Sequence, residues 1–239
     1  MRPLSEPPEE KGGLAKALVV GLLNSVPVVG GVGGAALEYA LGWGYGDRMK
    51  LWLNDLASRI EEIQEEVEGL TSSDQFLDAV VQGTRAAMAT HQKEKLAALQ
   101  EGVIHSIGPD APDVDEQARF FRLIDQFTPS HLRILAYLDN PLGMFELKGI
   151  ELPPPGVRVE RSGIDLAMPE FAGKSDWFEL IGNDLRQAFL IDSRSPIGMS
   201  LESWADLNGL KLTTELGERF LRFTGTKISP ITKPITRPR

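Results

Sequence analysis

Histidine and glutamate side chains recur at helical spacing in the middle of the chain, where they could bind a metal ion. His91, Glu94, Glu101 and His105 fall on one broad stripe of a predicted helix, and imidazole and carboxylate groups are common metal ligands. At a rise of 1.5 Å per residue, His91 and His105 lie about 21 Å apart and cannot share an ion. Each His/Glu pair would need ligands from another helix, such as His131. We therefore interpret the four residues as a candidate interaction stripe and predict no metal site.

Other patterns that carry chemistry fail on their context. Residues 31–36 fit the Gly-x-Gly-x-x-Ala dinucleotide fingerprint, but an amphipathic helix follows where a βαβ unit needs a second strand. Asp110, Asp113 and Asp115 lack the spacing and the glycine of a calcium-binding EF-hand. The chain has no cysteine, and it shows no Ser-His-Asp spacing, phosphate-binding loop or zincin motif. We therefore predict a protein that is not an enzyme and has no cofactor.

A glycine-rich apolar segment covers residues 14–46. Residues 17–37 carry no charge over a length that could cross a bilayer. Five glycines and Pro27 oppose insertion, and Pro27 divides the segment into two arms that are each too short to span a membrane. We predict a buried helical hairpin, with membrane insertion of residues 14–41 as the alternative. Small residues that permit close helix packing in either case are Gly30, Gly33, Gly34, Ala36, Ala40 and Gly44.

The net charge of -9 is confined to the first half of the chain. Residues 1–127 hold 20 acidic and 11 basic side chains, whereas residues 128–239 hold 14 of each. Nonspecific nucleic-acid binding depends on positive charge, so the first half argues against it. The absence of cysteine suits a reducing compartment, and the acidic start of the chain does not resemble a secretory signal. The expected location is therefore cytoplasmic, or membrane-associated if residues 14–41 insert.

Hydrophobic periodicity predicts a mostly α-helical protein. The clearest stripe follows Asp47, which is placed to cap its helix, and consists of Met49, Trp52, Leu53, Leu56, Ile60, Ile63 and Val67. One long helix is expected from Ser72, with a capping box to Gln75, as far as Ile104. Further helices are expected at residues 113–127, 128–138, 175–191 and 215–223, the last capped by Thr213 or Thr214.

The second half has the element order of a winged-helix domain. A helix at 130–138, a longer helix ending at 191, a strand at Leu210–Leu212 and a threonine-capped helix follow one another. The fold class predicted for the chain is a helical hairpin or bundle over residues 1–127, then a winged-helix-like α+β module over residues 128–225. Residues 226–239 are expected to form a disordered tail. The candidate recognition helix carries Asp176, Glu179 and Asp184 against Arg186 alone, which disfavours DNA as its ligand.

Several segments together resemble widespread bacterial proteins of unknown function and, more distantly, the Abi-alpha abortive-infection family. The resemblance covers residues 70–225 and is carried by Thr-His-Gln-Lys-Glu-Lys at 90–95, by residues 121–135 and by residues 214–223. It implies a cytoplasmic bacterial protein with a link to phage defence, and it implies no catalytic residues.

The sequence thus predicts a non-enzymatic helical interaction protein, with phage defence as the role that the resemblance implies. A protein partner or self-association is expected, and nucleic acid is not. The first alternative is a membrane-inserting effector that uses residues 14–41, and the second is a DNA-binding regulator.

Overall fold

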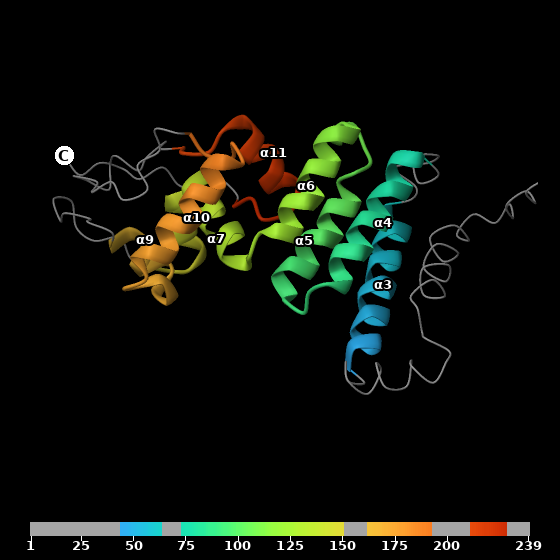
Figure 1. The fold of residues 1–239 in the computed structure, drawn as a ribbon, viewed down its shortest axis with the longest axis horizontal. Coiled ribbons are helices and arrows are strands. Elements are labelled where there is room, and N and C mark those ends of the chain that lie inside the picture. The colour runs from blue at the N-terminus through green and yellow to red at the C-terminus, as the bar shows by residue number, and fades with distance from the viewer. Residues whose placement is uncertain (1–43, 64–72, 151–161, 193–210, 229–239) are drawn as a thin grey trace, which may run out of the picture. The chain divides into compact units, whose positions relative to one another are not determined.

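A computed structural model describes residues 44–63, 73–150, 162–192 and 211–228, and these are mostly α-helical, as predicted. Figure 1 shows helices, without a sheet among the described residues. The chain divides into two compact units, residues 1–121 and residues 122–239. The division falls inside α6, and the boundary inferred from the sequence lies at the C-terminal end of the same helix. The helices are α3 (Gly44–Ile63), α4 (Asp74–Met88), α5 (Lys93–Ile104), α6 (Val114–Gln126), α7 (Pro129–Asp139), α8 (Pro141–Leu147), α9 (Ser162–Ala167), η2 (Pro169–Phe171), α10 (Ser175–Gln187) and α11 (Glu215–Phe223).

In the first unit, α3 buries the first five residues of the predicted stripe, while Ile63 is half-buried and Val67 lies outside the described residues. Met49, Trp52, Leu53, Leu56 and Ile60 are all buried, as spacings of three and four require of one helix face. The helix begins at Gly44, which corrects the cap expected at Asp47. Hydrophobic spacing in the sequence therefore predicts the buried face of α3, but it does not predict the residue at which the helix begins.

The expected helix from Ser72 to Ile104 is two helices, α4 and α5, and this is a correction. Ala89 N donates to Ala86 O at 3.1 Å and Thr90 N donates to Ala87 O at 3.3 Å, and these bonds close α4. The Thr90 hydroxyl then accepts the N–H of Gln92 at 3.2 Å, a local bond with which Thr competes against helical bonding. The two helices pack on each other as an antiparallel hairpin (Figure 1). Between them, a Cβ built on Gly83 would lie 2.8 Å from Val103 Cγ2.

Buried polar side chains fix the helices of the first unit against one another. Trp52 Nε1 donates to Leu96 O at 2.9 Å, and Gln100 Nε2 donates to Trp52 O at 3.1 Å, so α3 and α5 exchange two bonds. The N-cap of α4 is Ser73, whose hydroxyl accepts from Phe76 N. The N-cap is thus Ser73 and not Ser72, which corrects the predicted capping box, and the amide of Gln75 donates to Pro112 O at 2.8 Å.

In the second unit, α8, α10 and α11 all contact α7, which is the central helix. Nearly every residue of α7 from His131 to Leu138 is buried. Thr128 precedes Pro129 at the start of α7, and Thr214 caps α11 through Gly217 N at 3.0 Å, both as predicted. Burial raises the pKa of the Tyr137 phenol well above its usual range, because the phenolate would lose its hydration.

The predicted β-wing is not supported. The described residues contain no strand, and Ile191 and Thr213 form an isolated antiparallel bridge. Within the expected strand Leu210–Leu212, Leu210 lies outside the described residues, and Leu212 N bonds to Leu138 O at the end of α7. Leu212 O in turn accepts from Asp192 N. These two bonds satisfy the backbone N–H and C=O groups of Leu212 without the ladder of hydrogen bonds that paired β-strands form.

Several predictions fall on residues that the structure does not describe. They are the hairpin at 14–46 apart from its last residues, and the disordered tail at 226–239 apart from its first three. Of the small residues named for close packing, Gly44 begins α3, and the other five lie outside the described ranges. Among the helices that are described, none is long and apolar enough to cross a membrane.

Candidate interaction surface

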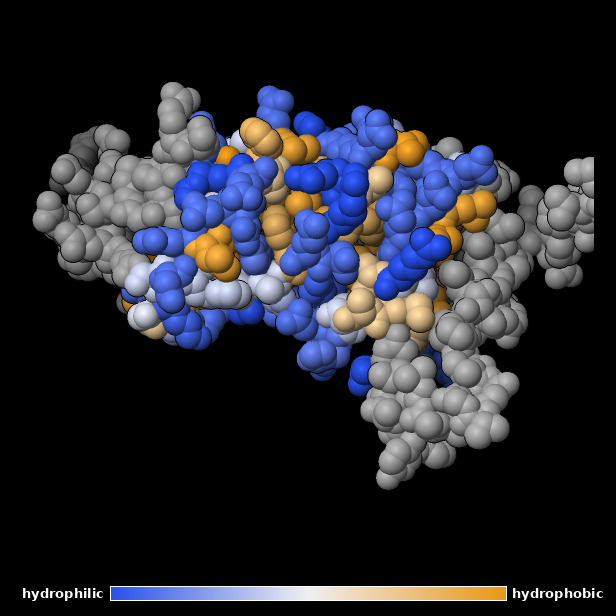
Figure 2. All heavy atoms as spheres, viewed as in Figure 1, coloured by the Kyte–Doolittle hydropathy of each residue, from blue (hydrophilic) through white to orange (hydrophobic). Residues whose placement is uncertain are grey.

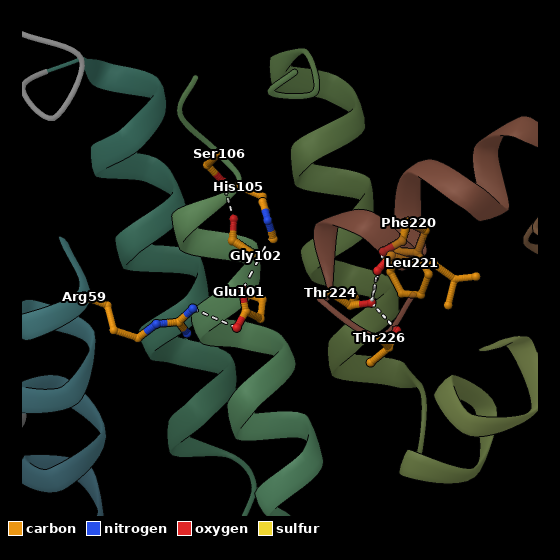
Figure 3. Close-up of polar contacts among 9 residues, drawn as sticks. All are labelled: Arg59, Glu101, Gly102, His105, Ser106, Phe220, Leu221, Thr224 and Thr226. Carbon is orange, nitrogen blue, oxygen red and sulfur yellow. Dashed lines mark hydrogen bonds and ion pairs between the residues drawn. The ribbon is translucent and has the colours of Figure 1, made fainter. Parts of the chain in front are cut away.

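The predicted interaction stripe is divided between a connection and a helix. His91 is exposed and lies between α4 and α5, while Glu94, Glu101 and His105 belong to α5 or its C-cap. Glu101 is brought close to His105, with 3.9 Å between Oε2 and Nδ1. Figure 3 shows Arg59 of α3 reaching Glu101, where Nη2 and Oε1 lie 2.7 Å apart. Glu101 therefore joins α3 to α5, and the four residues do not form one continuous site.

The second unit leaves large apolar side chains exposed on α10. Phe178, Ile181 and Leu185 are buried on its inner face, whereas Trp177 is 39% and Leu180 47% exposed. Trp177, Leu180 and Asp184 follow one another at spacings of three and four, so they share one side of the helix. We call these three residues the α10 strip. In the face shown in Figure 2, hydrophobic residues reach the surface in separate areas between hydrophilic ones.

Phe189, directly after the C-cap of α10, combines exposure with a strained backbone. Its φ is 60° and the residue is 73% exposed. Phe189 N bonds to Arg186 O at 2.9 Å, and Leu190 N bonds to Leu185 O at 3.0 Å. These bonds place Phe189 at the left-handed position that ends many helices and that glycine usually occupies. A bulky residue with this φ is an outlier, so the fold does not explain the choice of phenylalanine.

Hydrogen bonds from the start of α11 hold the backbone at Phe189 and Leu190. Thr214 Oγ1 donates to Phe189 O at 2.7 Å, and Thr214 N donates to Leu190 O at 3.0 Å. A Cβ built on Gly217 would lie 2.1 Å from Leu190 O, so glycine is required for this approach. The strained conformation is therefore held by α11 as well as by the end of α10.

Behind the α10 strip, His131 connects Asp184 to the start of α7. His131 Nδ1 accepts the N–H of Thr128 at 3.2 Å and lies 2.9 Å from Thr128 Oγ1. Because a backbone N–H can only donate, the ring proton belongs to Nε2, which donates to Asp184 Oδ2 at 3.1 Å. The buried ring also stacks on Phe127, with centroids 4.7 Å apart.

The hydroxyl, imidazole and carboxylate of this cluster are the group types of a nucleophile–base–acid array. Here, however, Nδ1 of His131, which is the nitrogen that would serve as the base, already accepts the backbone N–H of Thr128. The cluster therefore fixes the carboxylate of Asp184 and the first turn of α7. From the sequence, His131 is expected only as an additional metal ligand, and its bond to Asp184 is not predicted. The spacing from Thr128 to His131, which is that of an N-cap and its third helical residue, is the signal that could have located it.

The outer side of α10 is acidic. Asp176 and Glu179 are exposed, and neither pairs with a cation among the described residues. The one basic side chain of α10, Arg186, donates to the side-chain carbonyl oxygen of Asn183. Asp184 adds a carboxylate whose side chain is 42% exposed. The surface that surrounds Leu180 therefore combines apolar contact area with negative charge.

Within the described ranges, no group of three or more His, Asp or Glu side chains could hold a metal ion. Comparison of the chain with protein-family models, with curated proteins and with solved structures gave no match.

Proposed function

We propose that the chain is a non-enzymatic helical interaction protein, and that the α10 strip together with Phe189 binds a protein segment. The observation that carries the proposal is Phe189, an exposed aromatic side chain on a left-handed backbone. Such a conformation disfavours folding by about 1–2 kcal/mol, and a residue that is 73% exposed recovers little of this by burial. Strain of this kind is concentrated at functional positions in proteins.

The composition of the surface supports the same proposal. Single exposed apolar residues are ordinary, but Trp177 and Leu180 are neighbours on one side of α10 and Phe189 stands at its end. Aromatic residues are enriched among the few side chains that carry most of the binding energy at protein interfaces. His131 holds Asp184 in place at the edge of this surface, which limits the entropy that binding would remove.

The observed charges disfavour the DNA-binding alternative. The helices α7, α10 and α11 keep the order that the winged-helix hypothesis requires, and α10 would then be the recognition helix. Its exposed carboxylates would face phosphate groups with which they cannot pair favourably. A protein segment that carries basic and apolar side chains suits the surface better. We retain the link to phage defence and the membrane effector as hypotheses about the biological context.

Site-specific photo-crosslinking in the native host tests the proposal. A benzophenone amino acid replaces Leu180 in one variant and Glu179, an exposed neighbour on another side of α10, in the control. We expect the variant with benzophenone at position 180 to form a discrete covalent adduct with the protein segment that it binds. The variant with benzophenone at position 179 should not form this adduct. Identical adduct patterns at the two positions would remove α10 as a specific surface.

A further inference from the structure

We infer that residues 229–239 of the same chain dock on the α10 strip and are the segment that its charge selects. This inference rests on the proposed function, since it names the occupant of the same surface. Residues 229–239, Ser-Pro-Ile-Thr-Lys-Pro-Ile-Thr-Arg-Pro-Arg, contain Lys233, Arg237 and Arg239 and no acidic residue. Ile231 and Ile235 supply apolar side chains between them.

Charge distinguishes this segment from the others that lie outside the described residues. Residues 64–72 carry three glutamates and no basic residue, and residues 193–210 carry Arg194 against Glu202 and Asp206. Residues 1–43 also have more acidic than basic side chains, and residues 151–161 have equal numbers. Residues 229–239 are thus the segment whose charge is opposite to that of α10.

A second copy of α10 is a poorer occupant. Two copies of the α10 strip packed face to face would bring the carboxylates of Asp176 and Asp184 together. Like charges placed opposite each other disfavour association, which a basic segment avoids. Residues 229–239 of the same chain are therefore the occupant that we propose.

The chain leaves α11 at a place from which α10 can be reached. Thr224 Oγ1 bonds to Phe220 O at 3.0 Å, to Leu221 O at 3.2 Å and to Thr226 Oγ1 at 2.6 Å, and Figure 3 shows these bonds at the end of α11. Lys227 Nζ lies 3.5 Å from Glu218 Oε2 in the first turn of α11, so the described chain after α11 stays beside that helix. The start of α11 contacts Phe189 and Leu190 at the end of α10.

The distances are also sufficient. Helix α11 has nine residues and is about 13 Å long. Eleven extended residues reach about 36 Å. Residues 229–239 can therefore pass the length of α11 and still cover the α10 strip.

Paramagnetic relaxation enhancement in the full chain tests this contact. Because the protein has no cysteine, Thr236→Cys provides a unique site for a nitroxide label, keeps Ile231, Ile235 and the three basic residues, and leaves α10 unaltered. We expect the label to broaden the backbone amide signals of Leu180 and Asn183 in the 15N-labelled chain. Leu51, an exposed apolar residue of the first unit, serves as the reference.

Charge reversal gives the matched control. With Lys233→Glu, Arg237→Glu and Arg239→Glu in the labelled chain, we expect the ratio of docked to undocked chains to fall about ten-fold, since exposed ion pairs contribute modestly but together. Salt at about 1 M, where the Debye length is about 3 Å, should also lower the ratio of docked to undocked chains. Trp177→Ser with Leu180→Ser should abolish the broadening at Asn183.

Three outcomes would overturn the inference. They are no broadening on α10, broadening that charge reversal leaves unchanged, and broadening that also occurs when the nitroxide is on a separate, 14N chain. The last result would assign the contact to a second copy. A crosslink from position 180 to another protein, without any broadening from the label, would refute the intrachain contact and leave the proposed function standing.

Discussion

Replacement of Phe189 separates backbone strain from side-chain contact. Phe189→Gly and Phe189→Ala both remove the aromatic ring, so they lose the same packing and differ by one Cβ. At a φ of 60°, the Cβ disfavours the fold by about 1–2 kcal/mol. Glycine loses more chain entropy on folding, by about 0.5–1 kcal/mol. The glycine variant should therefore be more stable than the alanine variant by about 0.5–1 kcal/mol.

Urea denaturation followed by far-UV circular dichroism measures this difference. The comparison of Glu179→Gly with Glu179→Ala is the control, because position 179 is exposed inside α10. There glycine should be the less stable variant by about 1 kcal/mol. If the alanine variant at position 189 is as stable as the glycine variant, Phe189 is not held in a strained left-handed conformation. Both variants at position 189 should bind the protein segment less tightly than the unaltered chain does. This is the behaviour of a residue that is kept for binding at the expense of stability.

Three further substitutions test the packing. Gly217→Ala should destabilise the protein by more than about 2 kcal/mol, because its Cβ would meet the rigid carbonyl of Leu190; an unchanged urea midpoint would refute this contact. Gly83→Ala should cost about 1–3 kcal/mol, and Val103→Ala in the same chain should recover part of this loss by making room; additive losses would contradict the close approach. Tyr137 has a raised pKa, so its contribution to stability is full below about pH 10 and declines as the pH rises further; Tyr137→Phe should make urea midpoints less sensitive to pH in that range, and equal sensitivity would show that the phenol is not buried.

Much of the helical architecture could be predicted because it is encoded locally. The buried stripe of α3 is a property of spacing alone, and Thr128 with Pro129 marks the start of α7. The break between α4 and α5 could not be read from periodicity, since Thr90 lies within a pattern that continues on both sides. Asn140 and Pro141 indicate the end of a helix in the sequence, whereas in the structure Asn140 also caps α8 by accepting from Gly143 N at 2.9 Å.

The surface was only partly predictable. Helical spacing groups Trp177 and Phe189 with the buried residues of α10, but the structure leaves both exposed. For Trp177 the reason is that α10 packs through a narrower face than the pattern allows. For Phe189 the reason is that α10 ends at Gln187, four residues before the predicted end at residue 191, and a positive φ turns the chain. The link from His131 to Asp184 spans 53 residues of sequence, so no local pattern could show it.

Crosslinking from the end of α10 tests the central claim most directly. A benzophenone amino acid at position 189 is combined with Trp177→Ser and Leu180→Ser, or with Leu51→Ser in the first unit as control, and circular dichroism checks that each variant is folded. If the α10 strip and residue 189 form one binding surface, the adduct from position 189 will be lost in the double variant and retained in the control. An adduct of equal yield in both would contradict a shared surface.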